Sequence, residues 1–443
     1  MRTAEEFKNE VYSRSNRQTR KRRTRFKLAL SGTAVVAMAL VIVILGNFMG
    51  GTANIVTIQA ADLMEGIEKQ SVAGKDRDDT FIDSQMRFYT QLFKESVRAS
   101  EEKNVLISPT SVMLALAMAT NGAKGATRTE LENVLGGGIS IEELNEYLYT
   151  YVNGLAAEEG NKLQISNSIW LRDDIEVEKD FLQTNANYYG ASAYKGPFDE
   201  SLVSDVNKWV NHSTDGLIDK IMDEVGESDC AYLINAVLFD AKWQELYTSS
   251  DISFGKFVGY HREKQSAEFM ASSESIYIDD GRATGFIKPY KGGDYSFVGL
   301  LPNEGVDILE YIDEFTYKDT MASAKKDTVL VTMPKFTYEY DLEMSDILKV
   351  MGIEKAFNSE ADFTGLGYSP YGNIVMSKVN HKTFITVDDS GTKAGAVTKV
   401  DMTDECGPLE SEKNVRLDRP FVYMIIDNET NLPIFMGAVM DIQ

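Results

Sequence analysis

The chain has 443 residues, of which 43% are hydrophobic and 26% are charged, values typical of a globular protein. Its formal net charge is −23, yet residues 1–27 hold ten Lys or Arg and three Glu, a balance of +7, so the remainder carries −30. An acidic body of this kind disfavours nucleic acid as a partner. Two cysteines and three histidines exclude a disulfide framework and a cysteine-rich metal site, so we expect no metal and no cofactor.

The N-terminal region predicts a membrane anchor. Eight of the fourteen residues in 14–27 are basic, and no charged residue follows until Asp62. About 20 apolar residues span a bilayer core of about 30 Å, so residues 28–50 are expected to cross the membrane once. Basic residues before the span predict that residues 1–27 are a cytoplasmic tail and that the rest is extracellular. The alternative is a signal peptide whose cleavage releases a secreted protein.

Residues 51–80 mix small, polar and charged side chains and predict an extracellular stalk. As a flexible coil this segment would have a root-mean-square reach of about 30 Å. Organised structure is expected to begin near Asp83, which suits the N-cap of an amphipathic helix. The main domain is therefore predicted to cover residues 81–443.

Helices and strands follow without a regular βα repeat. Ser108 is expected to cap a buried helix that ends near Gly122, and Thr127 with Glu130 resembles a capping box for the next helix. Apolar runs predict strands, residues 203–221 are expected to form a helix followed by a turn, and residues 342–351 are expected to form a helix. The predicted strands are 163–171, 231–243, 295–301, 328–333, 421–426 and 432–439. This mixture predicts an α+β fold.

Residues 388–405 combine the flanks of a loop with the alternation of a strand. One face is small or apolar and carries Thr392, Ala394, Ala396, Thr398, Val400 and Met402. The other face carries Lys393, Lys399 and Asp401, which a slip of one residue would bury. The pattern predicts a loop that later becomes a half-buried strand, and an ordinary exposed loop is the alternative.

Several further blocks resemble one protein family. They are Asn104, Ser108, Pro109, Ser111, Gly122 and Thr127; Asn235, Phe239 and Trp243; and residues 301–305, 334–336, 361–365, 418–421 and 435–437. In this order and spacing the chain resembles the serpins, the serine protease inhibitor superfamily, in a membrane-anchored and prokaryote-like form. The resemblance implies the serpin fold, with three β-sheets, about nine helices and an exposed reactive-centre loop.

The resemblance also implies a function. A serpin loop is cut by its target protease and then inserts into the main sheet while the protease is still acyl-linked, which makes the protein an irreversible suicide inhibitor. The expected partners are extracellular serine-type endopeptidases, with cysteine proteases as an alternative, and the protein is expected to be a monomer. The chain lacks a nucleophile–base pattern, so we do not expect this protein to be an enzyme. A non-inhibitory binding or carrier protein is the alternative function.

Site residues follow by position in the family pattern. The implied hinge comprises Gly391, Thr392, Ala394, Gly395, Ala396 and Thr398, with Gly391 expected where the chain needs freedom in φ. The implied strand-opening cluster comprises Ser108, Ser111, Asn235, His381 and Trp243. Lys393 stands where inhibitors of the family usually have Glu. Because this side chain is expected to point outward, we predict a change in the rate of inhibition and not a loss of inhibition. Fourteen residues beyond Gly391 lies the expected reactive bond, Glu405–Cys406, with Met402 and Lys399 as alternatives before the cut.

Overall fold

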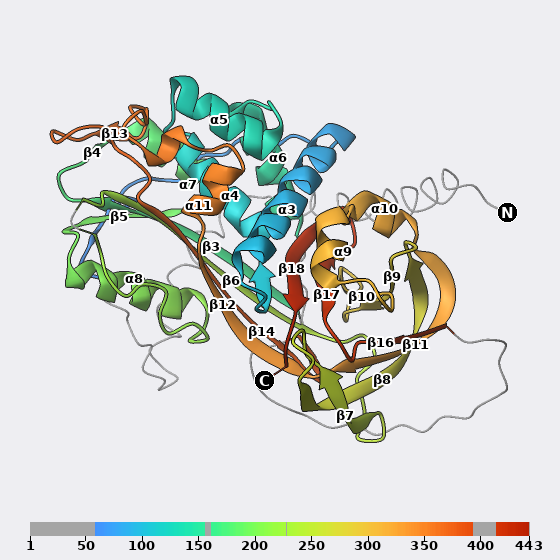
Figure 1. The fold of residues 1–443 in the computed structure, drawn as a ribbon. Coiled ribbons are helices and arrows are strands. Elements are labelled where there is room, and N and C mark those ends of the chain that lie inside the picture. Colours follow the sequence, from blue (N-terminus) through green and yellow to red (C-terminus); the bar gives the residue numbers. More distant parts are fainter. Residues whose placement is uncertain (1–57, 156–160, 227, 393–412, 443) are drawn as a thin grey trace, which may run out of the picture. The chain divides into compact units, whose positions relative to one another are not determined.

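The computed structural model describes residues 58–155, 161–226, 228–392 and 413–442 (Figure 1). The predicted tail and membrane span, residues 1–27 and 28–50, lie outside these ranges. Within the described ranges, no helix has the length and apolar character needed to cross a bilayer.

The main sheet has seven strands, in the order β1-β5-β3-β6-β15-β14-β12. In that order their bounds are Ala61–Asp62, Ser192–Gly196, Asn161–Arg172, Ala231–Lys242, Gly391–Thr392, Lys378–Val387 and Phe336–Glu343. The two long apolar runs predicted as strands are β3 and β6, which pair antiparallel at the centre of the sheet. The loop discussed above enters this sheet as β15.

A second sheet of nine strands has the order β16-β11-β8-β9-β10-β17-β18-β2, with β7 paired to β8. Their bounds are Lys413–Arg416, Lys325–Pro334, Lys264–Asp279, Ala283–Pro289, Tyr295–Pro302, Phe421–Asp427, Pro433–Val439, Val105–Ile107 and, for β7, Ile252–Val258. Both strands of the C-terminal hairpin, β17 and β18, are buried along their whole length, as their apolar sequence predicts. A two-stranded sheet joins β4 (Glu176–Val177) to β13 (Gly367–Tyr368).

Nine α-helices and one 3-10 helix occur in the described part of the chain. The α-helices are α3 (Asp79–Ala99), α4 (Pro109–Thr120), α5 (Gly125–Gly136), α6 (Ile141–Gly154), α7 (Lys179–Tyr189), α8 (Glu200–Ser213), α9 (Ile308–Glu314), α10 (Tyr317–Ala322) and α11 (Ser345–Val350). The 3-10 helix is Lys355–Phe357. Three sheets and nine helices confirm the predicted α+β fold.

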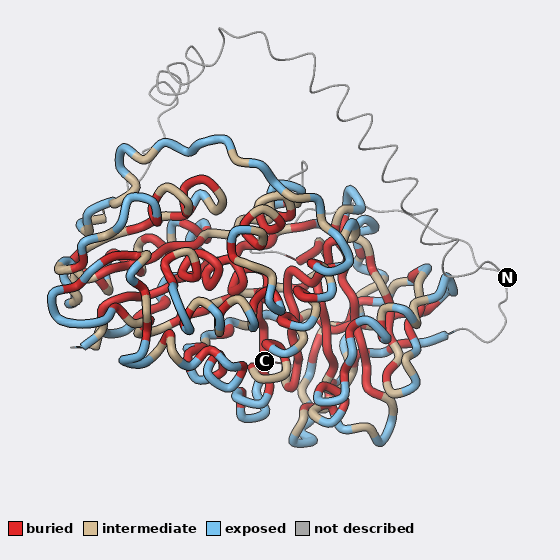
Figure 2. Tube along the Cα trace, turned by 90° about the horizontal axis from the view of Figure 1, so that it is seen from above, coloured by how far each residue is buried: buried red, intermediate tan, exposed pale blue. Residues whose placement is uncertain are grey.

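Strand β6 feeds two hydrophobic cores because its side chains alternate between faces. Leu233 and Val237 join the core that contains α4, whose residues are all buried. Tyr232, Ile234 and Ala236 join a second core with the apolar side of α8. Figure 1 shows the sheet between these helices, and Figure 2 shows buried chain through the centre. A strand buried on both faces reads as a continuous apolar run, which is how the sequence of β6 reads.

Two expected helix caps differ from the structure. Helix α3 begins at Asp79, and Asp78 is its N-cap, with a carboxylate that accepts the Phe81 N–H at 2.9 Å. Asp83 therefore lies inside the helix, one turn after the true start. Ser108 does occupy the N-cap position of α4, but its hydroxyl makes no capping hydrogen bond.

The capping box expected from Thr127 and Glu130 is wrong. Both residues lie inside α5, which begins at Gly125. The Thr127 hydroxyl instead accepts the Asp362 N–H at 3.0 Å, and the Glu130 carboxylate accepts the Lys355 N–H at 2.8 Å. These side chains bind a distant loop, because buried backbone N–H groups need acceptors wherever they occur.

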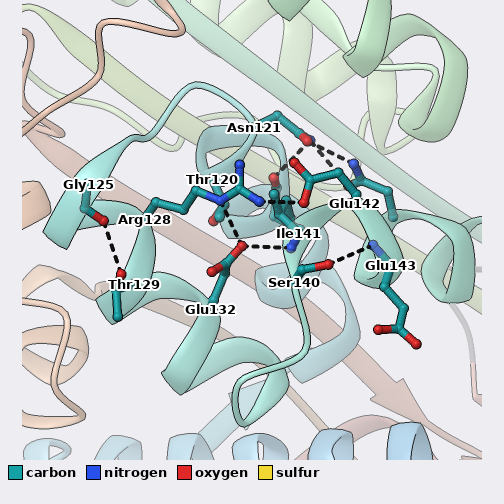
Figure 3. A network of polar contacts seen from close by, with 12 residues as sticks. Thr120, Asn121, Gly125, Arg128, Thr129, Glu132, Ser140, Ile141, Glu142 and Glu143 are labelled. Carbon is teal, nitrogen blue, oxygen red and sulfur yellow. Dashed lines mark hydrogen bonds and ion pairs between the residues drawn. The ribbon is translucent and has the colours of Figure 1, made fainter.

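Helices α5 and α6 are joined by a polar network (Figure 3). The Arg128 guanidinium lies between the carboxylates of Glu132 and Glu142. Glu132 also accepts the Ile141 N–H at 2.8 Å, and Ser140 caps α6 through the Glu143 N–H. One carboxylate thus connects the end of α5 to an otherwise unsatisfied N–H at the start of α6.

Residues 58–78, here named the strap, lie against the body. Strand β1 pairs antiparallel with β5 and so extends the main sheet by one edge strand. The buried Asp205 carboxylate on α8 accepts the N–H groups of Gln59 and Ala60 at 2.6 and 2.8 Å. Farther along, the Lys75 N–H donates to the Glu146 carbonyl at 3.1 Å. The described part of the expected stalk is therefore bound to the domain rather than a free coil.

We predict that Asp205→Ala loosens the strap. The variant removes a charged acceptor from two backbone donors, so the free energy of unfolding should fall by about 2 kcal/mol in urea titrations. Trypsin should also cut faster after Lys69. Lys208→Gln is the control, because it removes only a partly exposed ion pair to the same carboxylate at 3.4 Å. Unchanged stability and cleavage in Asp205→Ala would show that other contacts hold the strap.

Candidate functional site

The end of β14 turns back into the main sheet as β15. Gly391 and Thr392 pair with Lys242 and Ala241 of β6, and Thr392 also pairs with Val387 of β14. Residues 388–390 form the turn, in which the Asp388 N–H donates to the Gly391 carbonyl at 3.0 Å. We name residues 388–392 the loop root. It forms a short wedge between the two strands.

Gly391 is required for a reason other than the one expected. Its φ is outside the left-handed region, so freedom in φ does not explain it. A Cβ at Gly391 would lie 2.1 Å from the Ala241 carbonyl oxygen and 2.7 Å from the Lys242 Cα. The close approach of the loop root to β6 therefore demands a residue without a side chain.

Thr392 faces inward and is 2% exposed. Its hydroxyl lies 2.5 Å from the Tyr290 hydroxyl, and the Tyr290 ring stacks on Trp243 with centroids 4.6 Å apart. A small side chain fits beneath this aromatic pair. A long or charged one would have to displace it.

Trp243 and Tyr247 hold the turn of the loop root. The Trp243 indole N–H donates to the Asp388 carbonyl at 2.8 Å, and its backbone N–H donates to the Ser390 carbonyl at 3.0 Å. The Tyr247 N–H donates to the Asp389 carbonyl at 3.2 Å. Three consecutive carbonyl groups are thereby fixed by two aromatic residues.

The other four residues of the expected cluster meet in the core. The Ser108 N–H donates to His381 Nε2 at 3.0 Å, and His381 Nδ1 lies 3.0 Å from Asn235 Oδ1. The Asn235 amide donates to the Ser111 carbonyl at 3.1 Å and also contacts the Ser111 hydroxyl and Asn167 Oδ1. All five side chains are buried. The network connects β3, β6 and β14 to the start of α4.

His381 is neutral in this network. Because Nε2 accepts a backbone N–H, the ring proton lies on Nδ1 and is donated to Asn235. Burial lowers the pKa of His381 to about 3. A charged imidazole would lose the Ser108 contact and would have no counter-charge.

The cluster lies where β6 and β14 are joined. In the described chain these strands pair directly through five residues each, Tyr232–Ala236 with Lys378–Lys382, and His381 is opposite Asn235. The loop root separates the same strands at their other end. The geometry therefore contains a wedge and, beyond it, a clasp made of five ladder pairs and a buried polar network.

Some predicted site residues lie outside the described ranges. These are Ala394, Gly395, Ala396, Thr398, the bond Glu405–Cys406, and the alternatives Met402 and Lys399. Sequence reasoning missed Asn167, Tyr247 and Tyr290. Asn167 stood out as a polar residue in an apolar strand, but nothing local indicated that the two tyrosines reach the loop root. In the described ranges, no group of His, Cys, Asp and Glu side chains is arranged to hold a metal.

The amino-acid sequence matches a known protein family. The model of the serpin (serine protease inhibitor) family matches residues 83–442. The chain belongs to the serpin family. Human neuroserpin is 29% identical over 358 residues, which cover 77% of this chain and 86% of neuroserpin. Serpin-ZXA of Oryza sativa subsp. japonica is 30% identical over 359 residues, 76% of this chain and 90% of the rice protein. A relative from the archaeon Methanosarcina mazei is 30% identical over 368 residues, so relatives from an animal, a plant and an archaeon match this chain equally well and do not decide the prokaryote-like expectation.

Solved structures agree with the fold. Tengpin, a thermophilic serpin, in the native state is 47% identical with a TM-score of 0.84, over 87% of this chain and 100% of tengpin. Tengpin in the latent state is 46% identical with a TM-score of 0.75, over 84% and 100%. The structure of this chain is thus more similar to native tengpin than to latent tengpin.

We predict that His381 makes stability depend on pH. Since the folded pKa is about 3 and the unfolded one about 6.5, stability is full above pH 6.5 and is lost as pH falls towards 3. Between pH 8 and pH 5 this amounts to about 2 kcal/mol. The stability gap between the wild type and His381→Gln, measured in urea, should therefore narrow by that amount. The gap for Thr383→Val, a buried substitution on the same strand that removes no titratable group, should stay constant. A constant gap for His381→Gln would contradict a neutral buried imidazole.

Proposed function

We propose that this serpin is an irreversible suicide inhibitor of extracellular serine-type endopeptidases. After cleavage, the loop following Thr392 would insert into the main sheet as a new strand between β6 and β14. The observation that carries the proposal is β15, because Gly391 is already paired with β6 and Thr392 is already paired with both β6 and β14. The protein would thus act as a consumed substrate and not as an enzyme.

The register of β15 can be continued along both neighbours. Ala394 would then face Phe239 and Ile385, Ala396 would face Val237 and Thr383, and Thr398 would face Asn235 and His381. Phe239, Val237 and Ile385 belong to the main core. Small inward side chains suit that core, because added volume in a packed interior is destabilising.

The same register accounts for the unusual Lys393. This residue would lie opposite Asp240 of β6 on the outward face. Opposite charges across neighbouring strands contribute roughly 0.2–1 kcal/mol, whereas like charges are unfavourable. Lys393 in this chain is therefore compatible with insertion, and the usual Glu would face a carboxylate.

Insertion must open the clasp. Thr398 would take the place between Asn235 and His381, which now contact each other. Every ladder pair that is lost between β6 and β14 can be replaced by two with the new strand. The uninserted state would then be a kinetic trap, and cleavage would release it. Native and latent tengpin, at 47% and 46% identity, support this proposal, since that one serpin has been solved in both states.

We further propose that the target cuts at Glu405–Cys406, which would favour a protease with a preference for acidic residues. Met402 and Lys399 remain alternatives for other specificities. Cysteine proteases are the second class of target. A serpin-fold binding or carrier protein is the alternative function, and the first experiment below separates it from inhibition.

The basic and apolar sequence of residues 14–50 supports a membrane location. We propose a single-pass membrane protein with residues 28–50 in the bilayer, and secretion after cleavage is the alternative. The strap joins β5 beside the start of β6, through Lys195, Leu171 and Ala231. The loop root lies beside the end of β6, at Lys242. Strand β6 has 12 residues, so the two points are separated by roughly 35–40 Å along the sheet. The loop would therefore be presented far from the tether.

We predict a covalent complex with a matched protease. Proteases that cut after Glu, Met and Lys are incubated with the protein and analysed by SDS gel electrophoresis. A 1:1 band that survives SDS is expected with at least one of them, because the acyl bond is trapped. Mass spectrometry of the released fragment identifies the cut bond. If all three give only cleaved protein, the binding-protein alternative is favoured.

We also predict that Thr392→Arg converts the inhibitor into a substrate. The charged side chain would enter the site beneath Tyr290 and Trp243, where burying an unpaired charge is costly. The protease should then cut the loop and leave, so complex disappears and cleaved protein remains. Lys393→Ala, one residue along on the outward face, is the matched control and should still form complex. Persistent inhibition by Thr392→Arg would refute the inward register.

A further inference from the structure

A buried ion pair lies behind the loop root. The side chains of Lys288 on β9 and Glu274 on β8 are 3% and 9% exposed, and Lys288 Nζ lies 2.8 Å from Glu274 Oε1. Lysine is almost never buried unless it is paired, because removing an ammonium group from water is expensive. Neither residue has a part in the wedge or the clasp described above. Such a pair is weak evidence for stability, so its position suggests another purpose.

The pair closes a ring of contacts with Tyr247. The Ser272 hydroxyl donates to Glu274 Oε1 at 2.7 Å and lies 3.2 Å from the Tyr247 hydroxyl. Lys288 Nζ in turn lies 4.6 Å from the centroid of the Tyr247 ring and 5.4 Å from that of Trp243. Both distances are within the range of cation–π attraction, which is stronger where water is excluded.

Trp243 and Tyr247, whose aromatic rings lie beside the Lys288 ammonium, are also the residues that hold the loop root. Trp243 and Tyr247 supply the three N–H groups bound to the carbonyls of Asp388, Asp389 and Ser390. The ammonium of Lys288 fixes the rings on one side, and the backbone of the same residues fixes the turn on the other. Only the side chains of Trp243 and Tyr247 therefore lie between the ion pair and the turn at residues 388–390.

We infer that Lys288 and Glu274 are positioning residues that hold the turn at 388–390 as a fixed pivot for loop insertion. This inference rests on the proposed function. Insertion competes with hydrolysis of the acyl bond, so a displaced pivot delays insertion and lets the protease escape. The pair would thus set the fraction of encounters that end in trapping. It would have little influence on how fast the exposed loop is first cut.

The test measures trapping and cutting separately. Glu274→Gln leaves the Lys288 ammonium buried without its counter-charge, so the ammonium should withdraw from the rings. The number of inhibitor molecules consumed per protease trapped should rise several-fold, while the rate of loop cleavage stays near the wild-type value. Lys318→Met is the control, because it removes an exposed ion pair to Asp83, and neither of these residues contacts the loop root. Its stoichiometry should be unchanged.

A double variant distinguishes positioning from stability. Replacing both partners by methionine removes the charges together, and such replacements of buried ion pairs are often neutral or stabilising. Lys288→Met with Glu274→Met should therefore restore the thermal midpoint to the wild-type value. The number of inhibitor molecules consumed per protease trapped should nevertheless stay raised. If stoichiometry recovers together with the midpoint, the pair acts only through stability and the inference is overturned.

Hydrogen exchange gives a readout that needs no protease. In uncleaved Glu274→Gln, the amides of Trp243 and Tyr247 should exchange faster, whereas the Ala60 amide in the strap should not change. Faster exchange in a protein that traps no protease would support the pivot and refute the proposed function. A wild type that traps protease, with exchange and stoichiometry both unaltered in Glu274→Gln, would refute the pivot alone.

Discussion

The structure depends on the direct pairing of β6 with β14. Five ladder pairs and the contact between His381 and Asn235 keep the sheet closed at one end, while the loop root holds it apart at the other. Because the five side chains of the polar network in the clasp are buried, a hydrogen bond that is lost there is costly. Such a contact favours two discrete arrangements over a gradual opening. The neutral His381 belongs to the closed arrangement, since a charged ring would break it.

The two-sided burial of β6 restricts what can lie beside it. One face meets α4 and the other meets α8, so a strand inserted next to β6 must match a dense core on the inward side. Thr392 already satisfies this condition beneath Tyr290 and Trp243. The small residues that follow it in the sequence, and the charges on the alternate positions, are consistent with the same requirement. If the residues after Thr392 insert beside β6 as proposed, the core would restrict them to small inward side chains.

The sequence predicted the architecture well because periodicity and apolar runs are local signals. The long strands β3 and β6, the buried C-terminal hairpin and the α+β class all followed from them. It predicted contacts less well. Gly391 was expected for its φ but is needed for close approach, and Thr127 bonds a loop 235 residues away instead of capping a helix. Lys288 carried no signal, since a lysine in a strand indicates an exposed face until its partner Glu274 is known.

The strap has a mechanical consequence. If residues 28–50 are held in a bilayer, tension from a captured protease would run from the loop root through β6, β3 and β5 to β1. The ladder between β3 and β6 has eleven residue pairs, whereas β1 and β5 share two. Hydrogen bonds loaded in series fail first at the smallest group. The strap would therefore detach first and lengthen the tether before the ladder between β3 and β6 failed.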